Sequence, residues 1–227
     1  MVETTLQEFG GRIAGTLRIG VLPSLGSHWL APRVADFVKI HPDVNVSVGT
    51  FDVDFSNAHK DPVTWDPSES DLVITWGKGG WRSLTYQKLA AEILVPVCSP
   101  KFLQDYTVNG QFDIWDVTRL GHKTRPDMWK TYSANIGTAK SIRMPKPGLV
   151  FDHFFMLLEA ARAGAGVTLL PSLIVSSDLS ENRLVKCAET VKSDAFYAIV
   201  ASDSAWRRPI VSAFANWIKA QDTEPMI

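Results

Sequence analysis

Small hydroxyl-bearing residues follow the first apolar segment of the chain. Residues 17–21 alternate apolar with polar or small side chains, which is the period-2 pattern of a β-strand, and Pro23 ends it. Four residues that precede a helical pattern come next: Ser24, Leu25, Gly26 and Ser27. Open α/β sheets bind small molecules where a strand meets a helix N-terminus, because backbone N–H groups and the helix dipole favour an anion there. We therefore expect an anion-recognition loop at 24–27, with helix capping by the serine hydroxyls as the alternative.

Sequence motifs of catalytic and metal sites are missing. The chain has no GxSxG, no HExxH and no paired Cys/His spacing. Asp71, His122 and Asp152 are too scattered to predict a catalytic triad. The glycine-rich turn GKGGW at 77–81 lacks the GxxxxGK[ST] spacing of a phosphate-binding loop. We expect no enzyme activity, no cofactor and no metal site.

The composition predicts a globular chain without the net positive charge that would attract nucleic acid. The 227 residues carry a formal net charge of -1, so no overall positive field exists. Cys98 and Cys187 lack any CxxC spacing; we interpret them as unpaired thiols in a reducing compartment, with a redox pair as the alternative. The sequence contains no run of about 18 apolar residues, so no membrane span is predicted. The N-terminus MVETTLQEFGGRIAG is acidic and polar, unlike a signal peptide, so we expect a cytoplasmic protein.

The periodic segments form two α/β groups with similar element order. The predicted strands are 17–21, 44–48, 71–76, 92–98, 120–123, 141–144, 167–170 and 195–201. The predicted helices begin near 27, 100, 127, 152, 171 and 209. Pro96 indicates an edge or a crossover position for its strand, and Asp152 is expected to cap its helix. The last strand and helix are too apolar to stand alone, so we expect them to return to the first group and leave a cleft between the two.

Six segments of the chain occur in the order and spacing of one known family. They are GTLRIGVLPS, WLAPRVADFVKIHPDVNVSV, DLVITWGKGGW, LVPVCSPKFL, FDHFFMLLEAARAGAGVTLLP and ENRLV. From Gly15 to about Lys219 the chain resembles the effector-binding domain of LysR-type transcriptional regulators. GKGGW and PVCSP resemble the subgroup of glycine-cleavage and β-lactamase regulators. Two segments depart from that subgroup: Arg82-Ser83 replaces its usual Pro-Gly, and prolines interrupt an expected helix between 51 and 71.

The resemblance implies an α/β, type 2 periplasmic-binding-protein-like fold. Two subdomains would be joined by two crossover strands, with a ligand cleft between them. Residues 1–14 would be the remnant of a linker helix, 15–98 plus 200–227 subdomain I, and 99–199 subdomain II. The family's N-terminal winged helix-turn-helix would be absent from this chain.

The resemblance also implies which residues contact the effector. These are Ser24, Leu25, Gly26, Ser27, Trp76, Trp81, Thr124, Trp129, Asp152, His153, Thr168 and Phe196. Structural alternatives stay open for several of them. Tryptophan is more often a core residue, Asp152 can be a plain N-cap, and a backbone carbonyl can satisfy the hydroxyl of Thr168.

The function implied by the resemblance is ligand sensing. A small effector, anionic or amino-acid-like, would bind in the cleft and control transcription through a homodimer or tetramer. DNA would be contacted only through the helix-turn-helix. The alternative is a periplasmic-type solute-binding protein of a transport system, which shares the fold.

Overall fold

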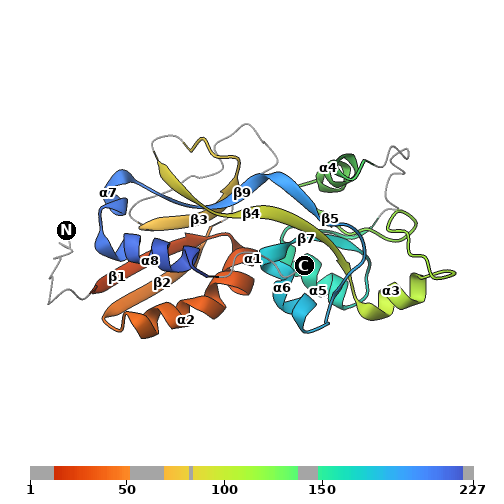
Figure 1. The fold of residues 1–227 in the computed structure, drawn as a ribbon, viewed down its shortest axis with the longest axis horizontal. Coiled ribbons are helices and arrows are strands. Elements are labelled where there is room, and N and C mark those ends of the chain that lie inside the picture. Colours follow the sequence, from red (N-terminus) through yellow and green to blue (C-terminus); the bar gives the residue numbers. More distant parts are fainter. Residues whose placement is uncertain (1–12, 52–68, 82–83, 138–147, 222–227) are drawn as a thin grey trace. The chain divides into compact units, whose positions relative to one another are not determined.

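The computed structural model describes residues 13–51, 69–81, 84–137 and 148–221, which form two compact units (Figure 1). Unit 1 contains the described residues up to Ala91 and those from Ala195 onward, and unit 2 contains those from Glu92 to Asp194. The chain changes unit within two long strands, β4 (Thr85–Cys98) and β9 (Val191–Ala201). The predicted strand at 141–144 lies outside the described residues, as does most of the loop predicted after Phe51.

The sheet of unit 1 is built around β1 (Gly15–Val21). This strand is parallel to both β2 (Val44–Thr50) and β3 (Leu72–Gly77), and β3 is antiparallel to β9. The order of these strands in the sheet is β2-β1-β3-β9, with β2 at the end. Leu17, Ile19 and Val21 are all buried, which confirms the alternation predicted from the sequence.

The helix after β1 starts earlier than the sequence predicted. Three helical segments run without interruption: α1 (Pro23–Leu25), the π-helical η1 (Gly26–Leu30) and α2 (Ala31–Ile40). Leu22 is the N-cap, and the Ser27 hydroxyl donates to the Pro23 carbonyl at 3.0 Å. The predicted capping by serine hydroxyls before a helix near Ser27 is therefore wrong. Pro23 explains the early start, because its fixed φ suits the first helical turn, where no N–H is needed.

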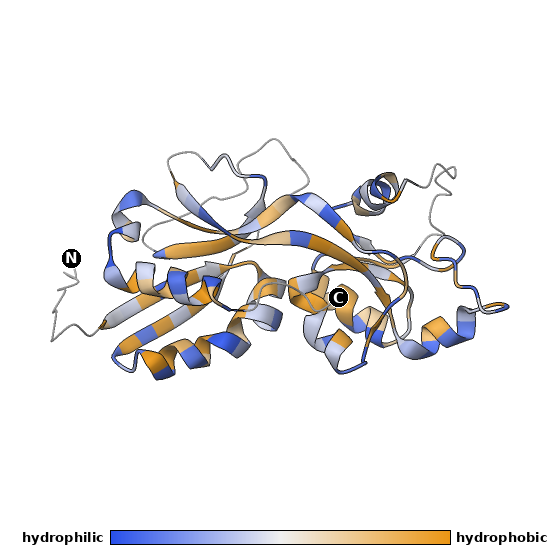
Figure 2. Ribbon diagram, viewed as in Figure 1, coloured by the Kyte–Doolittle hydropathy of each residue, from blue (hydrophilic) through white to orange (hydrophobic). Residues whose placement is uncertain are grey.

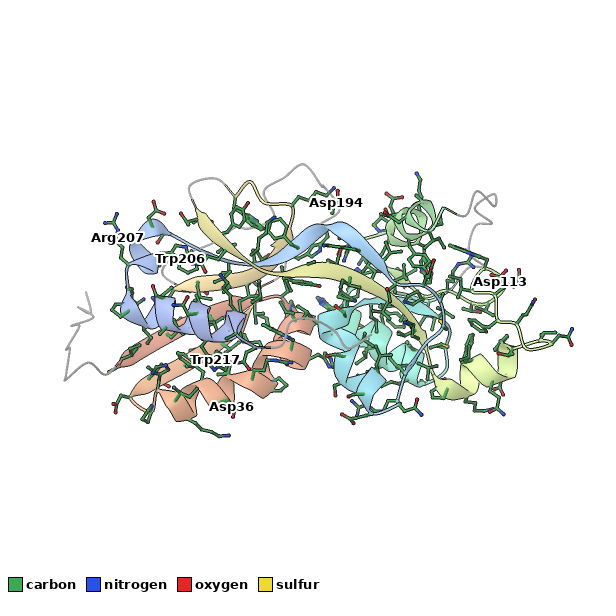
Figure 3. The ribbon with its side chains drawn as sticks, viewed as in Figure 1. Asp36, Asp113, Asp194, Trp206, Arg207 and Trp217 are labelled. Carbon is green, nitrogen blue, oxygen red and sulfur yellow. The ribbon has the colours of Figure 1, made fainter. Side chains whose placement is uncertain are left out.

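Two helices near the C-terminus complete unit 1: α7 (Asp203–Trp206) and α8 (Pro209–Lys219). Phe214 on α8 packs edge-on against Phe37 of α2, with ring centroids 5.2 Å apart, and both rings are fully buried. Asp36 on α2 pairs with Lys39 at 2.8 Å on the exposed side, and hydrophilic and hydrophobic bands alternate along that helix (Figures 2 and 3). Each helix thus buries one face, as the sequence predicted.

The described residues of unit 2 form short strands and four helices. Strands β7 (Thr168–Pro171) and β8 (Val185–Lys186) are both antiparallel to β4, whereas β5 (Gly121–His122) and β6 (Val150–Phe151) form a separate parallel pair. The helices are α3 (Pro100–Tyr106), α4 (Met128–Asn135), α5 (Phe154–Arg162) and α6 (Ser172–Ser180). All four agree in type with the predicted segments. In the part of the chain that the structure describes, no helix is long and apolar enough to cross a membrane.

Pro96 lies inside the sheet. Val97, the next residue, pairs with both Thr168 and Lys186, so this part of β4 has a strand on each side. The edge position considered from the sequence is therefore wrong, whereas β4 does cross from unit 1 into unit 2. Proline gives up one donor, but its carbonyl still accepts the Cys187 N–H at 3.0 Å.

Candidate functional site

The predicted loop at 24–27 forms the first turns of the helix after β1. Ser24, Leu25 and Gly26 are buried, whereas Ser27 is exposed. A Cβ atom on Gly26 would lie 2.8 Å from Cγ1 of Val21, so only glycine lets the helix approach the strand this closely. No side chain caps the first turn, because the N-cap residue Leu22 has no polar group.

Aromatic side chains gather near the end of β3 in unit 1. Trp81 is 4% exposed and packs edge-on against Phe196 of β9, with ring centroids 6.0 Å apart. Tyr86 stacks on the same phenyl ring at 5.7 Å, and the Lys88 ammonium lies 4.5 Å from its centroid. The structure thus brings together the predicted residues Trp81 and Phe196. Their neighbours Tyr86 and Lys88 were missed, because Thr85–Ala91 shows no strand signal in the sequence.

Trp76 and the glycine-rich turn lie beside this aromatic group. Trp76 pairs with Tyr197 in the β3–β9 ladder, one position before the Gly77–Phe196 pair. Gly79 and Gly80 then have φ of +89° and +84°, a backbone conformation that favours glycine. The turn thereby carries the chain from β3 to Trp81, whose buried Nε1 has no hydrogen-bond partner among the described residues.

In unit 2, the parallel strands β5 and β6 bring two predicted segments together. His122 pairs with Phe151, and the Lys123 N–H donates to the Phe151 carbonyl at 2.8 Å. The chain then leaves both strands at the same edge, where Thr124 follows β5, and Asp152 and His153 follow β6. This is the edge at which parallel strands present their ligand-binding loops.

The predicted cap of α5 is wrong. His153 is the N-cap residue, and its side chain does not cap the first turn. The Asp152 carboxylate instead pairs with the Lys123 ammonium at 3.2 Å, with both side chains largely exposed. His153 stacks on Phe155 with ring centroids 5.2 Å apart. Since β6 holds Phe151 in register with His122, Asp152 is placed beside Lys123 rather than over the helix.

A buried histidine supports this edge. His122 is 6% exposed, and burial lowers its pKa to about 4, with smaller contributions from Arg125 and His153 that Asp152 opposes. The neutral ring can accept a hydrogen bond at Nδ1, which lies 3.2 Å from the Thr124 hydroxyl. Thr124 is therefore oriented by a side chain that stays uncharged near neutral pH.

Arg125 anchors the same loop to the strands that link the units. Its guanidinium donates to both carboxylate oxygens of Glu92 at 2.7 and 3.0 Å, and Ser193 donates to Glu92 at 2.8 Å. Glu92 lies on β4 and is 0% exposed. Sequence reasoning missed this cluster. The one available signal was an acidic residue opening the apolar strand EILVPVC, since a buried carboxylate needs a partner.

Two predicted residues of unit 2 lie in its interior. Trp129 is 8% exposed, packs edge-on against Tyr132 and donates its indole N–H to the Leu120 carbonyl at 2.9 Å. Thr168 is fully buried, and its hydroxyl has no hydrogen-bond partner among the described residues. The backbone-carbonyl partner that the sequence favoured for Thr168 is not observed.

The predicted residues are divided between the two units. Ser24, Trp76, Trp81 and Phe196 belong to unit 1, whereas Thr124, Asp152 and His153 belong to unit 2. Each unit also contains a helix start whose N-cap residue makes no side-chain cap. A separate hollow in unit 1, between residues 18–20, 47–51 and 69–70, contains none of these residues. Among the described residues, no group of His, Cys, Asp and Glu side chains could hold a metal ion.

Two α/β units joined by two crossing strands define a type 2 periplasmic-binding-protein-like fold. The model of the LysR substrate binding domain matches residues 10–223. The chain therefore belongs to the LysR substrate-binding-domain family, as its sequence segments indicated.

Similar proteins agree with this assignment. The glycine cleavage system transcriptional activator of Escherichia coli strain K12 is 34% identical over 225 residues, which cover 97% of this chain and 70% of that protein. The transcriptional activator AmpR of Rhodobacter capsulatus is 29% identical over 228 residues, covering 98% and 73%. The solved AmpR effector binding domain of Citrobacter freundii has a TM-score of 0.71 at 26% identity, covering 90% of this chain and 96% of that one.

These relatives are transcriptional regulators, not enzymes or transport proteins. The chain is accordingly the effector-binding domain of a LysR-type transcriptional regulator, and the transport alternative is not supported.

Proposed function

We propose that this domain senses a small effector bearing a carboxylate, such as an amino acid or a peptide-like molecule. The observation that carries the proposal is the helix start at Pro23, directly after β1, where the N-cap residue Leu22 has no side chain that could cap the first turn. The N-terminus of a helix favours an anion through its backbone N–H groups and its dipole. An effector carboxylate would occupy this place in unit 1, beside Ser24.

Unit 2 would supply complementary contacts. The N-cap residue of α5, His153, makes no side-chain cap, and the Lys123–Asp152 pair offers one charge of each sign close in sequence to Thr124 and His153. An amino-acid-like effector carries both an anionic and a cationic group, so this mixture suits it. The aromatic group of Trp81 and Phe196 would contact apolar parts of the ligand.

Further properties belong to the same proposal. The domain would carry out no catalysis and need no cofactor, and it would act in the cytoplasm. It would assemble as a homodimer or tetramer and reach DNA only through a winged helix-turn-helix. Residues 15–98 with 200–227 and residues 99–199 would be the two subdomains that respond to the effector.

A ligand screen with matched variants tests the proposal. Amino acids, small carboxylates and cell-wall fragments are screened by thermal shift, and hits are titrated by calorimetry. Ser24→Ala and Thr124→Val should each weaken the best hit about tenfold or more, because a hydrogen bond to a charged group is worth about 1.5–3 kcal/mol. Ser47→Ala and Thr131→Val, on exposed positions of the same units, should leave affinity unchanged. A best ligand without any anionic group, or equal affinity in all four variants, would overturn the proposal.

A further inference from the structure

The two cysteines of the chain are neighbours in unit 2, although they are 89 positions apart in the sequence. The β4–β8 ladder pairs Cys98 with Val185 and Val97 with Lys186, and the Cys187 N–H continues it to the Pro96 carbonyl at 3.0 Å. Cys187 is therefore diagonal to Cys98 across two adjacent strands. Because side chains alternate with period 2, both thiols lie on the same face of the sheet.

The side chains themselves are in contact. Both belong to one apolar cluster, in which Cys98 is fully buried and Cys187 is partly buried against it. The Cys187 thiol hydrogen-bonds to the Cys98 sulfur, which lowers the pKa of Cys98; burial opposes this, and the Leu103 N–H assists it. The same bond raises the pKa of Cys187. When the pair loses one proton, the remaining proton therefore lies between the two sulfurs.

We propose that Cys98 and Cys187 form a reversible intramolecular disulfide when the domain meets a peroxide. Two thiols give up two electrons to the O–O bond, and no metal or cofactor is needed. The inference concerns residues outside both groups proposed to contact the effector, and it does not depend on them.

Each step of the reaction balances. The pair first loses one proton to solvent, which leaves the charge mainly on Cys98. Transfer of the remaining proton from Cys187 to Cys98 then places the charge on Cys187, the less buried of the two residues. The Cys187 thiolate attacks one peroxide oxygen, the O–O bond breaks, and the alcohol or water leaves after taking up a proton. Cys98 then attacks the sulfur of the resulting sulfenic acid, the S–O bond breaks, and hydroxide leaves as water with the Cys98 proton.

The backbone must adjust slightly to close the bond. Diagonal residues on adjacent strands have Cα atoms roughly 7–8 Å apart, whereas a disulfide needs about 4.4–6.8 Å. The required shift of about 1 Å falls on 187–190, an irregular segment between the two-residue strand β8 and the start of β9. The bond would form within unit 2, between the last residue of β4 and the segment that precedes β9.

Thiol counting and mass spectrometry test the proposal. The reduced chain is treated with hydrogen peroxide, and thiols are titrated in denaturant before and after dithiothreitol. We expect both thiols to disappear and to return on reduction, and a non-reduced digest to show the peptides of Cys98 and Cys187 joined with the loss of two hydrogens. The product should remain a single chain on a non-reducing gel.

Single-cysteine variants identify the order of events. In Cys98→Ser, dimedone should label Cys187 after peroxide, whereas the parent chain should show little label because the sulfenic acid is consumed. Cys98→Ala replaces the serine variant if that variant melts at a much lower temperature. In Cys187→Ser, the one remaining thiol, Cys98, should stay reduced after peroxide. Equal dimedone labelling of the parent and Cys98→Ser, persistence of both thiols, or disulfides only between chains would each overturn the proposal.

Discussion

Glu92 is a charged side chain with no exposure, and its neighbours explain how unit 2 accommodates it. Arg125 binds both carboxylate oxygens, and Ser193 donates a third hydrogen bond. In Glu92→Gln the Arg125 guanidinium would stay largely buried without its counter-charge. Removing one partner of a buried pair costs about 3 kcal/mol or more, so we expect a loss of that size in urea unfolding.

An exposed pair of the same unit is the matched control for this prediction. Glu159 pairs with Arg162 on α5, but its side chain is 62% exposed. Glu159→Gln should change the unfolding free energy by less than about 1 kcal/mol, because solvent screens exposed pairs. Equal losses in the two variants would show that the Glu92 cluster contributes no more than a surface pair.

His122 should make unit 2 sensitive to acid. Its pKa is lowered from 6.5 to about 4, so the unfolded chain binds a proton at a higher pH than the folded one. The contribution of the neutral His122 ring to the free energy of unfolding is fully present above pH 6.5. It decreases as the pH falls from 6.5 to about 4. The loss should approach roughly 3 kcal/mol, and His122→Gln should flatten that part of the stability profile. An unchanged slope in the variant would assign the acid sensitivity to other groups.

At the scale of elements, the contact between β1 and the following helix depends on one missing methyl group. Alanine normally stabilises a helix by about 1 kcal/mol relative to glycine. In Gly26→Ala, however, the added Cβ would lie 2.8 Å from Cγ1 of Val21, and overpacking costs about 1–3 kcal/mol. We therefore expect a lower melting temperature in Gly26→Ala. Adding Val21→Ala should restore part of the loss that the clash causes.

The control for this prediction is another glycine of unit 1. A Cβ atom added to Gly49 on β2 would meet no other atom within 4 Å, so Gly49→Ala should leave the melting temperature unchanged or slightly higher. If Gly26→Ala proved as stable as the parent, the helix could retreat from β1 without cost.

Local patterns predicted the elements, whereas contacts between distant segments were not predictable. The alternation at 17–21 and the apolar stripe of α8 can each be seen within one short segment of the sequence, and both are confirmed. The pairing of Asp152 with Lys123 depends on the register of β5 with β6, which no local pattern encodes. The Glu92–Arg125 bond likewise joins residues 33 positions apart. A family resemblance supplied the candidate site residues, but not these partners.

For the whole molecule, the outer surface of unit 1 bears on self-association. Trp29 and Leu30, in the helical segments after β1, are both fully buried and cannot form such a surface. Two apolar residues that are exposed are Ile40 at the end of α2, at 60%, and Val48 on β2, at 41%. Among the described residues, β2 is the last strand in the sheet order, and the outer side of an edge strand can pair with another chain.

We expect the chain to self-associate through this side of unit 1. The double variant Ile40→Glu/Val48→Lys should sediment as a monomer at a concentration where the parent associates, because charges on an edge strand oppose pairing. Val108→Lys is the matched control: that residue is 68% exposed in unit 2, and its replacement should leave the association unchanged. A parent chain that stays monomeric at high micromolar concentration would contradict self-association itself. A double variant that associates like the parent would instead move the interface to another surface, because a charge on β2 and a charge at the end of α2 could not remain in a closed contact without a large loss of affinity.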